Sequence, residues 1–216
     1  MKKNIVFIKN IKSFVDKFLI CSFILILVGC SKNNESNKKD TKPPVLSESI
    51  TDTSLTEEFL VFGYQLSPGR FNPAYEIITS TRTAKVFSAT SGVVQSVRFN
   101  GGVDESQNDY EIFIKTKGNS IYLILHDHVR NVVVGVGDIV SPGTILGDIG
   151  WRGVAQGRTE LQINNEDTDR ALCPESLGTA NFNLSFETAR TLNNTTYPSG
   201  NPKHFDSVCL SETVVP

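Results

Sequence analysis

Between Phe59 and Ile163 the sequence consists of short runs rich in Val, Ile, Phe and Tyr, each closed by Gly, Asn, Ser or Pro. Such runs predict β-strands separated by turns. Helical periodicity is almost absent before residue 180, and only Leu184–Leu192 predicts a short helix. We therefore expect an all-β fold, an antiparallel sheet or β-sandwich, with a short C-terminal tail that is irregular or partly helical. The nine expected strands are Phe59–Leu66, Glu76–Thr79, Lys85–Ser88, Gly92–Phe99, Tyr110–Lys115, Ser120–Val129, Asn131–Val134, Thr144–Ile149 and Arg158–Ile163.

The N-terminus predicts export. Residues 1–29 hold five lysines and the apolar run Phe18–Gly29, which is shorter than the roughly 20 residues of a membrane-spanning helix and typical of a secretory signal. The run ends in Leu27-Val28-Gly29-Cys30, which resembles the lipobox of bacterial lipoproteins. The resemblance implies cleavage before Cys30 and a lipid on its thiol, which anchors the chain to a membrane. Ser31 in place of Asp after the cysteine implies the outer membrane, facing the periplasm. The alternative is an uncleaved anchor with an incidental Cys30.

A polar segment follows the expected signal. Residues 30–58 are rich in Ser, Thr, Asn, Lys and Glu and contain Pro43-Pro44, which predicts a disordered tether. Removing the five lysines and one aspartate of residues 1–29 from the 21 basic and 23 acidic residues of the chain leaves 16 basic and 22 acidic ones. An acidic body repels phosphate backbones, so we expect no nucleic-acid partner.

The cysteines agree with export. Cys21 lies in the expected signal and Cys30 is the expected lipidation site, which leaves Cys173 and Cys209. An even pair in an oxidising compartment predicts a disulfide, here closing a C-terminal extension over residues 171–216. Two independent thiols are the alternative.

Four segments of the body each match a different sequence motif. Lys85–Val94 looks like a strand and turn of the form V-x-A-x-x-x-G-x-V, and Val134–Gly150 matches V-x-x-G-D-x-V-x-x-G-x-x-I-G-x-x-G at nearly every fixed position. Leu125–Val129 stands in the place of Tyr-x-His-Leu, and Gly157–Ile163 in the place of G-P-H-L-H-F-E-I. These segments resemble the lysostaphin/LytM-type zinc endopeptidases (duplicated hybrid motif). The resemblance implies a LytM-like domain over 59–170 with that family's β-fold and an envelope setting.

The family's zinc positions are changed in this chain. The resemblance implies ligands from an early His-x-x-x-Asp motif and from the second His of His-x-His, yet Asn72–Thr79 contains no His or Asp and Glu76 is its only acid. Arg158 and Glu160 stand at the His-x-His positions, and only His128 remains. Catalytic zinc needs about three protein ligands. We therefore expect neither a bound cofactor nor a catalytic residue, with His128 as a vestige of the active site.

A relocated zinc site is the alternative. Period-2 alternation puts His126 and His128 on one face of their strand, and pairing of the strands would bring Glu160 to them. Two His and one carboxylate are a legitimate zinc set. Against this set, Arg158 opposes a dication and would pair with Glu160. We expect His126, His128, Arg158 and Glu160 to line a polar binding groove bordered by Trp151, whose ring either stacks on a ligand or packs on the sheet.

Three functions follow from these expectations. The first is an envelope lipoprotein whose degenerate LytM-type domain binds peptidoglycan or regulates a cell-wall hydrolase. The second is a barrel-sandwich-hybrid adaptor, because the Gly137–Ile145 segment also resembles biotinyl/lipoyl-type domains, although the lysine of such domains is missing. The third is an active zinc metalloendopeptidase of peptidoglycan with relocated ligands.

Overall fold

The computed structural model describes residues 38–101 and 108–216, which belong to one compact unit. The expected signal peptide, the lipidation site Cys30 and the start of the expected tether lie outside the described residues. Among the helices that are described, none is both long and apolar enough to cross a membrane.

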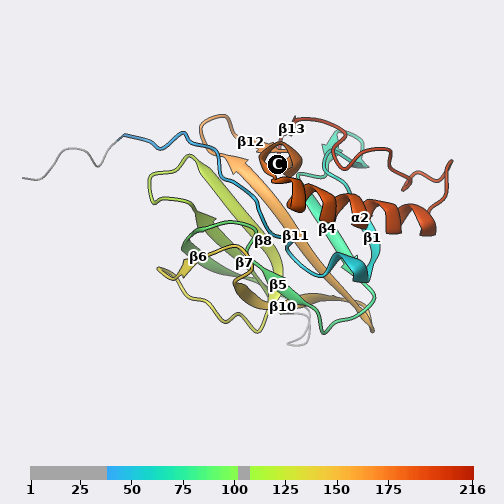
Figure 1. The fold of residues 1–216 in the computed structure, drawn as a ribbon, viewed down its shortest axis with the longest axis horizontal. Helices are drawn as coiled ribbons and strands as arrows, with labels where there is room; N and C mark the ends of the chain where they lie inside the picture. The colour runs from blue at the N-terminus through green and yellow to red at the C-terminus, as the bar shows by residue number, and fades with distance from the viewer. Residues whose placement is uncertain (1–37, 102–107) are drawn as a thin grey trace, which may run out of the picture. The chain divides into compact units, whose positions relative to one another are not determined.

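Antiparallel strands make up most of the unit, as the sequence predicts (Figure 1). Eleven strands join one sheet with the main order β1-β4-β11-β10-β8-β7-β6-β9, and the hairpin β2–β3 stands apart from it. The strand β11 is central, because it pairs with β4, β8, β10 and β12. The strands are β1 (Thr56–Leu60), β2 (Gln65–Ser67), β3 (Arg70–Phe71), β4 (Ala74–Thr79), β5 (Lys85–Phe87), β6 (Gly92–Gly101), β7 (Asp109–Lys115), β8 (Tyr122–Arg130), β9 (Ile139–Val140), β10 (Ile145–Arg152), β11 (Gln156–Asn165), β12 (Arg170–Leu172) and β13 (Thr213–Val214).

One expected strand is wrong. Residues Asn131–Val134 form a loop, because Asn131 has a φ of 45° and turns the chain away from the direction of β8. The other eight expected strands each overlap a strand of the structure.

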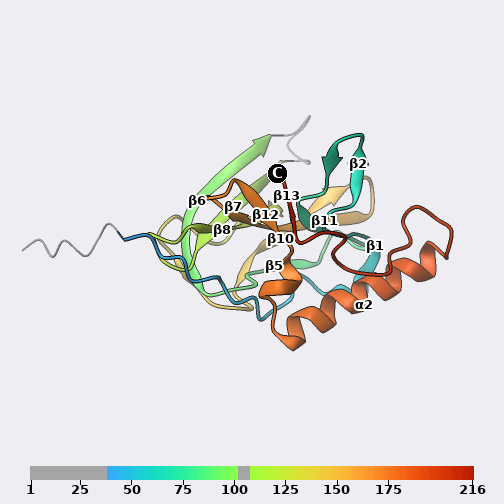
Figure 2. The ribbon, with the colours of Figure 1, turned by 90° about the horizontal axis from the view of Figure 1, so that it is seen from above.

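The C-terminal helix is longer than predicted. The helix α2 spans Ala180–Thr196 and is capped by Thr179, whose side chain accepts a hydrogen bond from the Phe182 amide. Its buried side chains, Phe182, Phe186, Ala189 and Asn193, recur at helical spacing. The helix lies along β1, with the Phe186 ring 4.6 Å from that of Tyr75 (Figure 2). Short 3-10 helices occupy Thr53–Leu55 and Pro174–Leu177.

Residues 38–58 are ordered, so the prediction of a disordered tether is wrong for this part of it. Leu46 and Ile50 are fully buried in the same core as the sheet. The Leu46 amide donates to the Leu177 carbonyl at 3.0 Å, and the Leu46 carbonyl accepts from Thr179 at 2.8 Å. A few apolar residues are enough to order this segment, because they pack into the core that the sheet and the C-terminal extension form. The expected boundaries at residues 58 and 170 therefore separate no independent bodies.

The predicted disulfide is confirmed. Cys173 and Cys209 are bonded, with their Cα atoms 6.1 Å apart and 36 positions apart in the chain. The bond holds the segment after α2 against β12 and the central strands, and Tyr75 Oη lies 3.3 Å from Cys209 Sγ.

Candidate functional site

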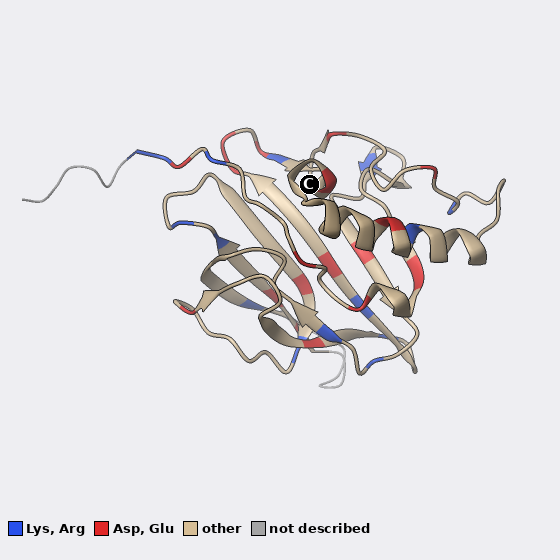
Figure 3. Ribbon diagram, viewed as in Figure 1, with Lys and Arg blue, Asp and Glu red and all other residues tan. Residues whose placement is uncertain are grey.

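Two neighbouring rows of residues, each aligned across adjacent strands of the sheet, differ in character: one is buried in the core and the other is acidic. Side chains opposite one another in adjacent strands lie on the same face. Tyr75, Leu161, His126 and Ile112 form one such row across β4, β11, β8 and β7, and all four are fully buried. The next row consists of Glu76, Glu160 and Asp127 on the other face, where acidic bands lie side by side on β4, β11 and β8 (Figure 3).

His126 lies in the core, so its expected place in the groove and in a zinc set is wrong. It has no exposed surface, and neither ring nitrogen has a hydrogen-bond partner among the described residues. Burial lowers the pKa of His126 to about 3, so the ring is neutral. The prediction that His126 and His128 share a face is wrong, because alternation of side chains holds only where the strand keeps its regular pleat.

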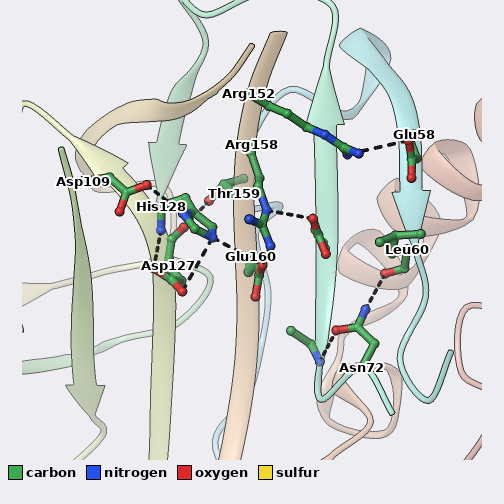
Figure 4. Close-up of polar contacts among 12 residues, drawn as sticks. Glu58, Leu60, Asn72, Asp109, Asp127, His128, Arg152, Arg158, Thr159 and Glu160 are labelled. Carbon is green, nitrogen blue, oxygen red and sulfur yellow. Dashed lines mark hydrogen bonds and ion pairs between the residues drawn. The ribbon is translucent and has the colours of Figure 1, made fainter. Parts of the chain in front are cut away.

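His128 breaks that pleat and turns to the acidic face. Its φ is 58°, an uncommon conformation for a residue with a side chain. Its Nδ1 lies 2.6 Å from Asp109 Oδ2, and its Nε2 lies 3.4 Å from Glu160 Oε1 and 3.8 Å from Asp127 Oδ2 (Figure 4). Gly150 of β10 permits this packing, because a Cβ there would come within 2.8 Å of His128.

Arg158 bridges the two glutamates of the acidic row. Its Nη2 donates to Glu160 Oε1, the pairing expected from the sequence. Its Nε lies 2.7 Å from Glu76 Oε1, an ion pair in which the N–H does not point squarely at the oxygen. The Arg158 side chain is one third exposed, whereas the side chains of Glu76 and Glu160 are 9% and 16% exposed.

The charges on this face depend on one another. Burial opposes the protonated form of His128, but hydrogen bonds to Asp109 and Glu160 and the charge of Asp127 outweigh it and raise its pKa to about 10. Burial acts against the charged form of Glu160 as well, yet His128 and Arg158 lower its pKa. Burial raises the pKa of Glu76 and of Asp127, and in both the neighbouring Glu160 adds to the rise. The face therefore holds two cations among four carboxylates.

Zinc at the positions implied by the resemblance does not fit these residues. Glu76 and Glu160 are carboxylates, but both contact the permanently charged guanidinium of Arg158. In the same region the side chain of Asn72 is already hydrogen-bonded to the backbone, since its Nδ2 donates to the carbonyls of Leu60 and Val61. A dication would have to displace Arg158 from both glutamates.

A different set of donors does come together. One ligand atom each from Asp109, Asp127 and His128 lies within 4.8 Å of the other two. Two carboxylates and an imidazole are suitable ligands for zinc or a similar metal. The Nδ1 of His128 is hydrogen-bonded to Asp109, so a metal bound there would have to use its Nε2 or break that bond.

Trp151 lies beside cations rather than in the acidic row. The Arg130 Cζ is 3.7 Å from the centroid of its ring and the Arg82 Cζ is 4.1 Å away. The indole is half-buried, so both expected roles, packing and ligand stacking, stay open.

Sequence reasoning missed Asp109 and Asp127. Asp127 stands between the two histidines, and alternation puts it on the face of the strand opposite to theirs. Asp109 begins β7, which pairs with β8 as the next strand along the chain. The hairpin signal between these two expected strands could have placed Asp109 near the end of β8.

Comparisons with known proteins come from solved structures alone, since neither protein-family models nor curated proteins match the sequence. Lysostaphin in solution is 17% identical over 54% of this chain and 46% of its own, with a TM-score of 0.40. The catalytic domain of lysostaphin from Staphylococcus simulans is 19% identical over 57% of this chain and 92% of its own, with a TM-score of 0.42. A zinc containing peptidase from Vibrio cholerae is 18% identical over 58% and 38%, with a TM-score of 0.44.

The chain thus spans about half the length of lysostaphin in solution. Each of these three structures aligns with somewhat more than half of this chain.

Proposed function

We propose that this chain is an envelope lipoprotein whose acidic face, formed by Glu76, Asp109, Asp127 and Glu160 with His128 and Arg158, binds peptidoglycan or regulates a cell-wall hydrolase, and that this face does not hydrolyse the wall. The observation that carries the proposal is the contact of Arg158 with both Glu76 and Glu160. A fixed cation stands where the resemblance implies a neutral imidazole that acts on water. An arginine cannot accept a proton from that water.

The rest of the acidic face supports binding. Its charged side chains lie on adjacent strands and contact one another, which makes the face rigid and polar. Such a surface can position the amide and ammonium groups of a wall peptide without reacting with them. Peptidoglycan as the partner rests on the resemblance and on the expected export and lipidation at Cys30.

A sedimentation assay tests this proposal. The chain from residue 30 onward, carrying Cys30→Ser, is incubated with purified peptidoglycan with and without added zinc. We expect the protein to pellet with the wall and no muropeptides to be released. Glu160→Gln should reduce pelleting, whereas Glu166→Gln, which alters an exposed carboxylate paired with Lys115, serves as the matched control. Release of muropeptides would contradict the proposal.

The second candidate is a metal-dependent activity. The convergence of Asp109, Asp127 and His128 favours it. Metal analysis of the purified chain separates the two candidates. One equivalent of metal that is lost in Asp127→Asn but kept in Glu76→Gln would favour the second.

Membrane anchoring is tested separately. Cys30→Ser in the full chain should abolish labelling by radioactive palmitate and leave an uncleaved or soluble precursor. Unchanged labelling would refute lipidation at this residue.

A further inference from the structure

Two guanidinium groups flank the indole of Trp151, and none of these three residues belongs to the acidic face. Arg130 ends β8, Trp151 lies in β10, and Arg82 lies in the loop between β4 and β5. The two Cζ atoms lie 3.7 Å and 4.1 Å from the ring centroid, within the range of cation–π contacts. Trp151 is the single tryptophan of the chain.

Neither of these cations forms an ion pair within the described part of the chain, although Asp148 feels the charge of Arg130, which helps to lower its pKa. No described carboxylate oxygen lies within 4 Å of either guanidinium, in contrast to Arg158 with its two glutamates. Asp148 is opposite Arg130 in the β8–β10 register, but Lys85 pairs with it and Asn131 Nδ2 donates to it at 2.8 Å. Arg130 Nε is buried and has no acceptor among the described residues.

A cavity of about 610 Å³ adjoins Arg130. Its polar lining consists of Arg130, Asn108, Asn131 and Tyr110, and valines form the remaining wall. Guanidinium, amide and phenol groups all offer hydrogen-bond donors, and none of the described lining residues is an Asp or Glu. These donors gather around one open, mostly polar hollow beside Arg130, where a single anion can accept from several of them.

We propose that Arg130 and the amides of Asn108 and Asn131 form a subsite for an oxyanion, the carboxylate or phosphate group of a larger ligand. A guanidinium binds such groups through paired, charge-assisted hydrogen bonds. Stacking on Trp151 holds its plane in place before binding, which reduces the entropy lost when the anion arrives. The proposal goes beyond the proposed function of the acidic face, because the subsite consists of other residues and is positively charged.

Trp151 provides the experiment, since its fluorescence reports directly on the arginines stacked against it. The chain from residue 30 onward, carrying Cys30→Ser, is titrated at constant ionic strength with inorganic phosphate, N-acetylalanine and N-acetylalanine amide. We expect a saturable change with phosphate or N-acetylalanine and none with the uncharged amide. A response to phosphate alone identifies a phosphate ligand, and a response to N-acetylalanine alone identifies a carboxylate.

Variants assign the effect to Arg130. Arg130→Gln should weaken binding roughly tenfold or more, as expected for loss of a charged hydrogen-bond partner. Arg98→Gln is the matched control, because Arg98 also lies over an aromatic ring, that of Phe113 at 4.3 Å. It should bind like the parent chain.

A measurement on the parent chain guards against a variant that does not fold. In NMR titrations the indole N–H of Trp151 and the side-chain amides of Asn108 and Asn131 should shift with one common affinity. No saturable response to either anion, or equal binding by folded Arg130→Gln, would overturn the subsite. Neither outcome would affect the sedimentation assay, which tests the acidic face.

Discussion

Glu76 and Glu160 lie directly opposite each other in β4 and β11, and the guanidinium of Arg158 contacts both. Like charges opposite one another destabilise a sheet. The arginine offsets that repulsion from the same face. The acidic row therefore depends on a cation that belongs to the chain itself.

Replacing Arg158 should expose that dependence. Arg158→Gln removes the ion pair of poorly hydrated Glu76 and leaves Glu160 with His128 as its remaining partner, and we expect a loss of roughly 2 kcal/mol in the free energy of unfolding at pH 7. Urea unfolding measures it. Lys39→Gln removes one partner of the exposed Lys39–Asp167 pair and should change stability by less than about 0.5 kcal/mol. Adding Glu76→Gln to Arg158→Gln should recover part of the loss, and no recovery would contradict the account.

His126 should make the fold acid-sensitive. Its pKa is about 3 in the folded chain, below the ordinary value of 6.5, so the unfolded chain binds the proton first. The stability tied to its neutral form is complete above pH 6.5 and is lost as the pH falls toward 3, by at most about 1.4 kcal/mol per pH unit.

His126→Leu tests this dependence. It removes two buried nitrogens that have no described partner, so we expect higher stability at pH 7 and a smaller decline between pH 6 and pH 4.5. Urea unfolding at several pH values measures both effects. An unchanged pH profile would show that another group governs acid sensitivity.

Residues 38–58 should be required for folding. A chain that starts at Lys38 keeps the buried side chains of Leu46 and Ile50 and the whole of β1. A chain that starts at Phe59 loses both side chains and the first three residues of β1, and two buried aliphatic side chains alone contribute roughly 3–6 kcal/mol. Circular dichroism and thermal unfolding should show a cooperative transition for the first chain only. Equal stability of the two chains would return this segment to the status of a tether.

Reduction of the disulfide should weaken the C-terminal extension. On the chain-entropy estimate, a loop of 36 residues stabilises by roughly 3–4 kcal/mol. Reductant or the pair Cys173→Ala and Cys209→Ala should lower the urea midpoint. Hydrogen exchange should increase first in β12 and β13, which the bond holds together. Exchange that increases uniformly across the sheet would contradict a local role.

The sequence alone determined most strand positions, because branched and aromatic runs closed by turn residues have few alternatives to a sheet. It also determined the disulfide, since the other two cysteines lie in or next to the expected signal. The contact of Arg158 with Glu160 followed as well, because residues two apart on a strand share a face. These features depend on local pattern or on composition.

Only the tertiary structure decided which side chains meet. The positive φ of His128 turns its side chain to the face of Asp127 and leaves His126 in the core. Strict alternation along a strand cannot predict such a change of face. Asp109 reaches His128 across a strand pairing, and Leu46 is held by Leu177 and Thr179, more than 130 residues further along the chain. Such contacts join segments distant in sequence, so their free energy comes from the assembled core and leaves no local signature.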